Sequence, residues 1–197
     1  GTQCTDPAAW EAYIRAAARI AGEAGVRIAR LNVGGGFPSH RLAGVVPQVE
    51  ATFALIARVT AEAFGEAAPA LVCEPGRALC GGGFAHAARV KAVRDGVHVF
   101  LNDGIYGAYA ELNLIGVIDR MTVLAPDGTA RGGAKAPRIV FGPTCDSVDR
   151  LPGEVMLAEG IAEGDFIVTE GMGAYSTVTN TRFNGFGDLG MATVLGF

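Results

Sequence analysis

The sequence predicts an α/β region over residues 1–80, followed by a β-rich domain over residues 81–197. In the first region, two long amphipathic helical patterns alternate with two short apolar runs, as in βα-type folds. In the second region, short apolar runs are separated by turns of glycine, proline and aspartate, which favours β-structure. With 197 residues, of which 50% are hydrophobic, the chain can bury a sizeable core.

The first helix is expected within residues 5–25, TDPAAWEAYIRAAARIAGEAG. Asp6 is a suitable N-cap and Pro7 suits the first helical position. Gly25 suits the position just after the last helical turn, where a left-handed residue is needed. The small and apolar residues that recur at helical spacing are Trp10, Tyr13, Ile14, Ala17, Ala18 and Ala21.

A second helix is expected within residues 45–65, beginning at Pro47 and ending at Gly65. Its predicted apolar face consists of Val49, Phe53, Ile56 and Thr60. A short buried strand is expected in residues 26–36, VRIARLNVGGG, and a short apolar strand in residues 69–77, PALVCEPGR. Both strands run into loops, which is where α/β folds keep their functional sites.

The β-rich half contains several runs that read as strands. They lie in residues 84–104, which turns at 95–96 and 103–104 interrupt, and in residues 120–126, 138–143 and 165–171. Residues 125–137, APDGTARGGAKAP, are expected to form a mobile loop, and residues 176–186, STVTNTRFNGF, a short helix.

Composition excludes several classes of function. The net charge is −4 without a basic block, which argues against nucleic-acid binding. No apolar run is long enough to span a membrane. The cysteines Cys4, Cys73, Cys80 and Cys145 lack CxxC spacing, and His40, His86 and His98 lack metal-site spacing, so no metal is expected. We expect a cytoplasmic protein with reduced thiols.

Two loops contain candidate cofactor-binding residues. In NVGGGFP, Gly34, Gly35 and Gly36 follow a strand, and their N–H groups could bind an anion, although glycine-rich turns are usually only turns. In EPGR, a Pro-Gly turn separates Glu74 from Arg77, which could contact the two ends of a ligand or simply form a local salt bridge.

The motif GPTCDSVDR places Cys145 and Asp146 after a Gly-Pro turn. They are either a reactive pair that faces a ligand, or a buried thiol beside a turn-capping acid. Tyr175 in GMGAY is either a ligand contact or a core aromatic residue whose hydroxyl is satisfied. Three further acids are expected at the surface or in turns: Glu111, Asp119 and Asp149.

These motifs occur in a specific order along the chain: GGG, EPGR, NDGIYG, GPTCDSVD, GAY and FNGF. The series resembles the ornithine/diaminopimelate/arginine decarboxylase family, whose members use pyridoxal 5′-phosphate (PLP) and have the alanine-racemase-type fold. The resemblance covers essentially the whole chain, as the C-terminal half of such an enzyme. It is most similar to the ornithine decarboxylase branch, because Asp146 stands where diaminopimelate decarboxylases usually carry Glu. The implied fold is the C-terminal part of a TIM (β/α)8 barrel followed by a β-barrel-like domain.

The resemblance also implies roles for the cofactor-binding residues. Gly34, Gly35 and Gly36 would bind the cofactor phosphate through backbone N–H groups, with Arg77, Tyr175 and Thr2 as further phosphate contacts. Glu74 would pair with the pyridine nitrogen and keep it protonated, so that the ring accepts the electron pair released as CO₂ leaves.

Catalysis is implied to need a homodimer with composite active sites. Cys145 and Asp146 would reach into the partner subunit's site, where the Cys protonates the carbon that has lost CO₂ and the Asp holds the distal amine of the substrate. The implied reaction converts a basic L-amino acid, of the ornithine or lysine type, to a diamine for polyamine biosynthesis. A diaminopimelate or carboxylated-polyamine decarboxylase is the alternative in the same class.

Two departures from the family pattern bear on this interpretation. The Schiff-base lysine of the family would lie before Gly1, and Lys91 and Lys135 lie in no matching motif. We therefore expect a piece of a longer polypeptide, with a split enzyme or a non-catalytic homologue that regulates a paralogue by heterodimerisation as alternatives. Leu114-Ile115 replaces the usual Tyr-Asp pair, unless Glu111 or Asp119 substitutes, so the identity of the diamino acid stays open.

Overall fold

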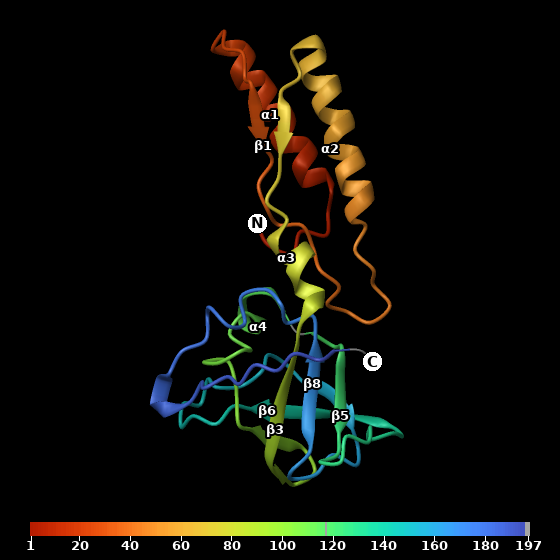
Figure 1. The fold of residues 1–197 in the computed structure, drawn as a ribbon, viewed down its shortest axis with the longest axis vertical. Coiled ribbons are helices and arrows are strands. Elements are labelled where there is room, and N and C mark those ends of the chain that lie inside the picture. Colours follow the sequence, from red (N-terminus) through yellow and green to blue (C-terminus); the bar gives the residue numbers. More distant parts are fainter. Residues whose placement is uncertain (117, 196–197) are drawn as a thin grey trace. The chain divides into compact units, whose positions relative to one another are not determined.

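A computed structural model describes residues 1–116 and 118–195 (Figure 1). Contacts between Cα atoms divide the chain into two compact units. The first unit consists of Gly1–His40 and Gly44–Gly81, and the second of Arg41–Ala43 and Gly82–Phe197. None of the helices in these described ranges is long and apolar enough to cross a membrane.

The first unit alternates helices and strands. In chain order its elements are α1 (Ala8–Glu23), β1 (Arg30–Asn32), α2 (Val49–Phe64), the 3₁₀ turn η1 (Gly65–Ala67), β2 (Ala70–Val72) and α3 (Gly76–Cys80). The strands β1 and β2 pair in parallel, with Leu31 opposite Leu71. Parallel pairing places the loops that follow both strands at the same edge of this small sheet.

The ends of α1 follow the predicted signals. The Asp6 carboxylate accepts a hydrogen bond from the Ala8 N–H at 2.9 Å, and Pro7 already has helical backbone angles. At the other end Gly25 takes a φ of 65°, and the Val26 N–H donates to the Ala21 carbonyl at 3.0 Å. This is a Schellman motif, which satisfies carbonyls that the helix leaves without a partner.

Aromatic packing joins the two long helices of the first unit. The Phe37 ring is fully buried and lies 4.9 Å from the Trp10 ring and 4.8 Å from the Phe53 ring, measured between centroids. Tyr13, which was expected on the apolar face of α1, is instead 75% exposed. The prediction of a buried strand in residues 26–36 is also wrong, because β1 is exposed at Arg30 and Asn32 and only Leu31 is half-buried.

The second unit contains a six-stranded sheet. Its strands are β3 (Ala85–Arg94), β4 (His98–Leu101), β5 (Met121–Leu124), β6 (Lys135–Phe141), β7 (Val155–Ala158) and β8 (Phe166–Glu170). They lie in the order β5-β8-β3-β4-β6-β7. The edge strands β5 and β7 contact each other, so the sheet curls into a nearly closed barrel (Figure 1). Its pairs are antiparallel except β4 and β6, which run in parallel.

Three short helical segments complete the described elements: η2 (Gly81–Gly83), which leads from the first unit into the second, and α4 (Leu112–Ile115) and η3 (Phe183–Gly185) of the second unit. Tyr109 is fully buried within the core, and its hydroxyl pairs with that of Thr169 at 3.0 Å. Asp95 and Gly96 both take positive φ values in the turn between β3 and β4, as the Asp-Gly pair predicted.

Two sequence expectations for the second unit need correction, and one strand was not predicted. The expected loop over residues 125–137 ends earlier, since β6 already begins at Lys135, and its middle is held by an ion pair of 2.8 Å from Arg131 to the buried Asp165. Residues 176–186 contain turns and η3 rather than an α-helix, and Asn184 takes non-helical angles there. The strand β7 was not predicted, because its four residues, VMLA, do not show the alternation of apolar and polar residues that marks a strand.

Candidate active site

In the first unit, the glycine-rich loop and the EPGR loop are bound to each other at the ends of β1 and β2. The Asn32 side-chain amide donates to Glu74 Oε1 at 2.7 Å, and its carbonyl oxygen accepts from the Gly34 N–H at 2.8 Å. The Glu74 N–H donates to the Gly34 carbonyl at 2.9 Å. Asn32 thus fixes the Glu74 carboxylate relative to the glycines, a role that nothing in the neighbouring sequence indicates.

The three glycines allow a backbone shape that other residues would disturb. Gly34 and Gly36 take φ values of 75° and 85°, in the region that favours glycine. A Cβ atom on Gly35 would lie 2.9 Å from the Glu74 carbonyl oxygen. A side chain at Gly35 would therefore push the two loops apart, and side chains at Gly34 and Gly36 would strain the backbone whose N–H groups could bind an anion.

Arg77 brings a positive charge to the same loops. It lies in α3 with only 6% of its surface exposed, and its Nε and Nη2 atoms lie 3.3 Å and 3.2 Å from Thr2 Oγ1. A planar guanidinium beside a hydroxyl group suits an oxyanion such as phosphate. The first unit therefore gathers Thr2, Gly34–Gly36, Glu74 and Arg77, with donors suited to a phosphorylated ligand and one carboxylate suited to a protonated ring nitrogen.

In the second unit, Cys145 and Asp146 lie on a bend after β6. Cys145 is exposed, so the alternative of a buried thiol is wrong. The Tyr106 hydroxyl donates to Asp146 Oδ2 at 2.5 Å, and the Val148 N–H donates to Oδ1 at 3.0 Å. The hydrogen bond from Tyr106 holds the pKa of Asp146 below its ordinary value and raises the pKa of Tyr106.

Asp149 organises this bend from within. It is only 1% exposed, so it is no surface acid, but it does belong to a turn, because its N–H donates to the Asp146 carbonyl at 3.0 Å. Its Oδ1 accepts from the Ile105 N–H at 3.0 Å, and its Oδ2 accepts from Thr144 N–H at 3.0 Å and Thr144 Oγ1 at 2.7 Å. Asp149 thereby joins the NDGIYG loop to the loop that carries Cys145.

A third segment, residues 180–187, closes over the same loops. The Thr181 N–H and hydroxyl both donate to the Tyr106 carbonyl, at 2.8 Å and 2.9 Å. The Phe183 ring lies 4.4 Å from the Tyr106 ring, and Asn184 Nδ2 lies 3.3 Å from Cys145 Sγ. The FNGF motif carries two of these residues, but only the fold reveals which partners they contact.

Tyr175 does not fill the core, since it is 50% exposed, with a φ of 65°. Its role as a phosphate contact stays a prediction. Leu114 is 84% exposed on α4. Of the two acids considered as substitutes for the missing family aspartate, Glu111 precedes α4 directly, and Asp119 accepts a hydrogen bond from the Ala43 N–H at 2.6 Å.

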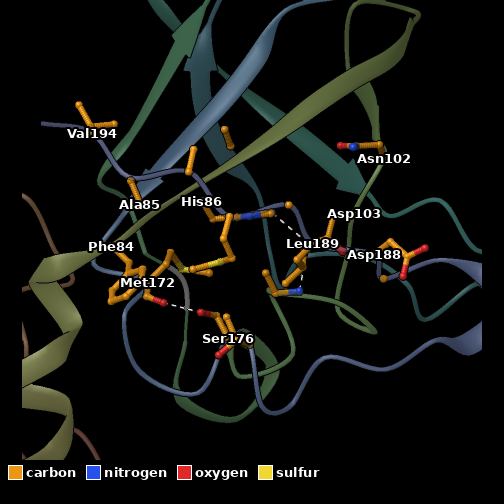
Figure 2. Close-up of a pocket in the computed structure, with 17 residues that line it drawn as sticks. Phe84, Ala85, His86, Asn102, Asp103, Met172, Ser176, Asp188, Leu189 and Val194 are labelled. Atoms are coloured by element: carbon orange, nitrogen blue, oxygen red, sulfur yellow. Dashed lines mark hydrogen bonds and ion pairs between the residues drawn. The ribbon is translucent and has the colours of Figure 1, made fainter.

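A cavity of about 390 Å³ in the second unit lies beside the NDGIYG loop (Figure 2). His86 Nε2 and Asp103 Oδ2 approach to 2.9 Å in its wall, and the same Asp103 oxygen accepts from the Ala108 N–H at 3.0 Å. Asp103 thus braces the turn that carries Tyr106. Within residues 1–116 and 118–195, no group of three His, Cys, Asp or Glu side chains could hold a metal ion.

Two family models match the chain. Residues 1–81 match the pyridoxal binding domain of pyridoxal-dependent decarboxylases, and residues 50–173 match the C-terminal sheet domain of the same proteins. The first match covers the loops that gather Glu74 and Arg77, and the second covers the bend of Cys145 and Asp146.

Individual relatives agree with the family models. A lysine/ornithine decarboxylase of Selenomonas ruminantium is 31% identical over 94% of this chain and 47% of its own length. A chloroplastic ornithine decarboxylase of Nicotiana glauca is 32% identical over 85% of this chain and 39% of its own. The crystal structure of a Vibrio vulnificus lysine/ornithine decarboxylase with cadaverine has a TM-score of 0.75 at 31% identity, covering 94% of this chain and 50% of that one. The chain spans about half the length of the curated relatives it matches.

Proposed function

The chain belongs to the pyridoxal-dependent decarboxylase family, and on that premise we propose that it supplies part of an enzyme that decarboxylates a basic L-amino acid. The substrate would be of the ornithine or lysine type and the product a diamine that serves polyamine biosynthesis. The observation that carries the proposal is the joined pair of loops that presents Gly34–Gly36, Glu74 and Arg77 together. Two crystal structures of the similar Vibrio vulnificus decarboxylase, one with cadaverine and one with putrescine, both diamines, support this substrate class.

The residues of the first unit fit PLP. The N–H groups of Gly34–Gly36, the Arg77 guanidinium and the Thr2 hydroxyl would bind its phosphate, with Tyr175 as a further contact. The Glu74 carboxylate, held by Asn32, would keep a proton on the ring nitrogen. Bound PLP would supply an electron sink for the pair of electrons released with CO₂.

Cys145 and Asp146 would act in the active site of a partner subunit, so the active unit would be a homodimer. The Asp146 carboxylate, oriented by Tyr106, would hold the distal ammonium of the substrate. The Cys145 thiol would give its proton to the carbon that has lost CO₂, and the electrons of the S–H bond would stay on sulfur. A second carboxylate for this ammonium would come from Glu111 or Asp119, which lie four positions before and after Ile115, the residue that replaces the family aspartate.

We further propose that residues 1–80 form the C-terminal part of a TIM barrel, that residues 81–197 form the β-rich domain, and that the protein works in the cytoplasm. The alternation of α1, β1, α2 and β2, with parallel strands, supports the barrel. A second candidate function is regulation without catalysis, which the similarity to Antizyme inhibitor 2 of Xenopus laevis favours, at 28% identity over 94% of this chain.

The proposal is tested with the complete polypeptide that contains these residues. CO₂ release is measured with ornithine, lysine and diaminopimelate, and bound PLP is followed by its absorbance. Arg77→Ala should lose PLP on dialysis, Glu74→Ala should retain PLP but slow CO₂ release, and Cys145→Ala should slow turnover or change the product. The exposed residues Arg27 and Glu66 provide matched controls as Arg27→Ala and Glu66→Ala.

The outcomes separate the two candidate functions. CO₂ release from ornithine or lysine that depends on Glu74 supports the decarboxylase. PLP retention and turnover that are equal in the Arg77 and Glu74 variants and in their controls would refute the assigned roles. No CO₂ release from any substrate, together with a stable heterodimer with an active decarboxylase, would favour the regulator.

A further inference from the structure

The backbone at Cys145 is held by hydrogen bonds, but the side chain of Cys145 has few contacts that restrain it. The Gly142 N–H donates to the Asp149 carbonyl at 2.8 Å, and the Asp149 N–H donates to the Asp146 carbonyl at 3.0 Å, which closes the bend on both sides of Cys145. The thiol itself is exposed. An exposed cysteine side chain can occupy three staggered rotamers, so some contact must select one if the sulfur is to transfer a proton in a defined direction.

Within the part of the chain that the structure describes, Asn184 donates a hydrogen bond to this sulfur. Its Nδ2 atom lies 3.3 Å from Cys145 Sγ, although the two residues are 39 positions apart in the chain. The amide N–H points a positive hydrogen at the sulfur, and a sulfur that has lost its proton accepts such a bond more strongly than a neutral thiol. The contact therefore both orients the sulfur and favours the anion that proton transfer leaves behind.

The backbone at Asn184 suggests that its side chain is there for a reason other than the turn. Asn184 has a φ of 54° and a ψ of 22°, in the left-handed region. Asparagine tolerates this conformation better than most residues, but glycine adopts it at no steric cost. Glycine could thus replace Asn184 in the turn, and what asparagine adds is the amide that reaches Cys145.

The turn that carries Asn184 is anchored to the residue that orients Asp146. Thr181 donates twice to the Tyr106 carbonyl, and the Phe183 ring packs on the Tyr106 ring at 4.4 Å between centroids. Tyr106 in turn donates to Asp146 at 2.5 Å. One segment thus fixes the carboxylate through Tyr106 and the thiol through Asn184.

We propose that Asn184 is a positioning residue for Cys145, with an amide that holds the sulfur in place and stabilises the thiolate formed on proton transfer. This inference rests on the proposed function for its catalytic meaning, because the proton goes to the carbon that has lost CO₂. The contact itself belongs to the second unit alone and can be tested without turnover.

The test is the rate at which iodoacetamide alkylates Cys145 in the complete polypeptide, resolved by peptide mass spectrometry. The thiolate displaces iodide, so stabilising the thiolate raises the rate. Cys73, exposed in the first unit, is the internal reference. Asn184→Gly keeps the left-handed turn and removes the amide, and Asn184→Asp replaces the donor by a negative carboxylate. Asn113→Asp, at an exposed position of the same unit, controls for the added charge.

We expect Asn184→Gly to slow alkylation of Cys145 roughly three- to tenfold relative to Cys73, as loss of one hydrogen bond to an anion implies. Asn184→Asp should slow it further, and Asn113→Asp should leave it unchanged. An unchanged or faster rate of Cys145 alkylation in Asn184→Gly would overturn the proposal. If Asn184→Asp does not fold, the result with Asn184→Gly alone tests the proposal. This result is independent of CO₂ release, so it separates failure of the inference from failure of the proposed function.

Discussion

Replacing Asp149 by asparagine tests whether its buried carboxylate holds the loop of Cys145 in place. The carboxylate accepts three hydrogen bonds, one at Oδ1 from Ile105 and two at Oδ2 from Thr144. In the Asp149→Asn variant the side chain would have the same size but one acceptor oxygen in place of two. Whichever way the amide turns, its NH₂ group would face a backbone N–H of Ile105 or Thr144.

The magnitude follows from this geometry. One buried N–H loses its acceptor, which costs about 1–3 kcal/mol, and the remaining bonds lose the strengthening that a charged acceptor provides. The site cannot relax easily, because Asp149 lies against the backbone of both Gly104 and Gly142, where even an added Cβ would overlap the carboxylate. We expect Asp149→Asn to lower the free energy of opening of this region by about 3 kcal/mol, or roughly 150-fold in local opening.

Amide hydrogen exchange measures this opening directly. Peptides that cover residues 102–107 and 142–149 should lose protection in Asp149→Asn, and Trp10 fluorescence, which reports on the first unit, should not change. Asp188→Asn is the matched control, because the Asp188 side chain is 83% exposed and its ion pair is worth little. Protection within a factor of about 3 of the parent protein in both peptides would refute the reasoning.

Three further predictions concern single groups. Tyr106→Phe should raise the pKa of Asp146 towards its ordinary value of 3.8, as measured by ¹³C NMR titration. In the parent protein the stability that comes from this lowered pKa is present above pH 3.8 and is lost as the pH falls through the lower folded-state pKa. An unchanged titration in the variant would contradict the hydrogen bond between Tyr106 and Asp146. Burial raises the pKa of the Tyr109 hydroxyl, so the unfolded state ionises first and the urea midpoint of unfolding should fall as the pH rises above about 10. The midpoint should fall less in Tyr109→Phe. An equal fall in the parent protein and in the variant would exclude Tyr109 as the cause. Gly35→Ala should weaken PLP retention, because the added Cβ would lie 2.9 Å from a backbone oxygen. Gly22→Ala is the control and should retain PLP, because no atom lies within 4 Å of the added Cβ. Equal PLP retention in the two variants would refute the steric argument.

Both ends of α1, the C-terminal end of α2 and many of the strands could be predicted because their signals are local, whereas α2 begins at Val49 rather than at the predicted Pro47. Asp6, Pro7 and Gly25 act on backbone atoms within the same or the adjacent turn of α1. The apolar runs likewise marked β3, β4, β5, β6 and β8. Sheet order carried no such signal, since nothing within β4 indicates that it pairs in parallel with β6.

The features of the candidate site likewise fall into those that the local sequence reveals and those that only the fold reveals. Gly34–Gly36 and Arg77 could be selected because glycine and charge at strand ends are visible in the sequence. The contacts of Asn32 with Glu74, Tyr106 with Asp146, and Asn184 with Cys145 span 42, 40 and 39 positions, and depend on which loops the fold brings together. Burial of Asp149 was missed because an acid within a polar turn gives no sign of the N–H groups that will surround it.

The parallel pairing of β4 and β6 has a consequence for how the barrel folds. The hairpins β3–β4 and β6–β7 join strands that are near neighbours in sequence, whereas His98 in β4 pairs with Ile139 in β6. Closing that loop of about 40 residues costs roughly 2 kcal/mol more chain entropy than closing a three-residue hairpin. The hairpins should therefore form early, and the long-range pairings of β4 with β6 and of β3 with β8 should form later. Doubling the length of the connection would add only about 0.6 kcal/mol, so evolution can lengthen or exchange the segment between these strands at little cost to the barrel.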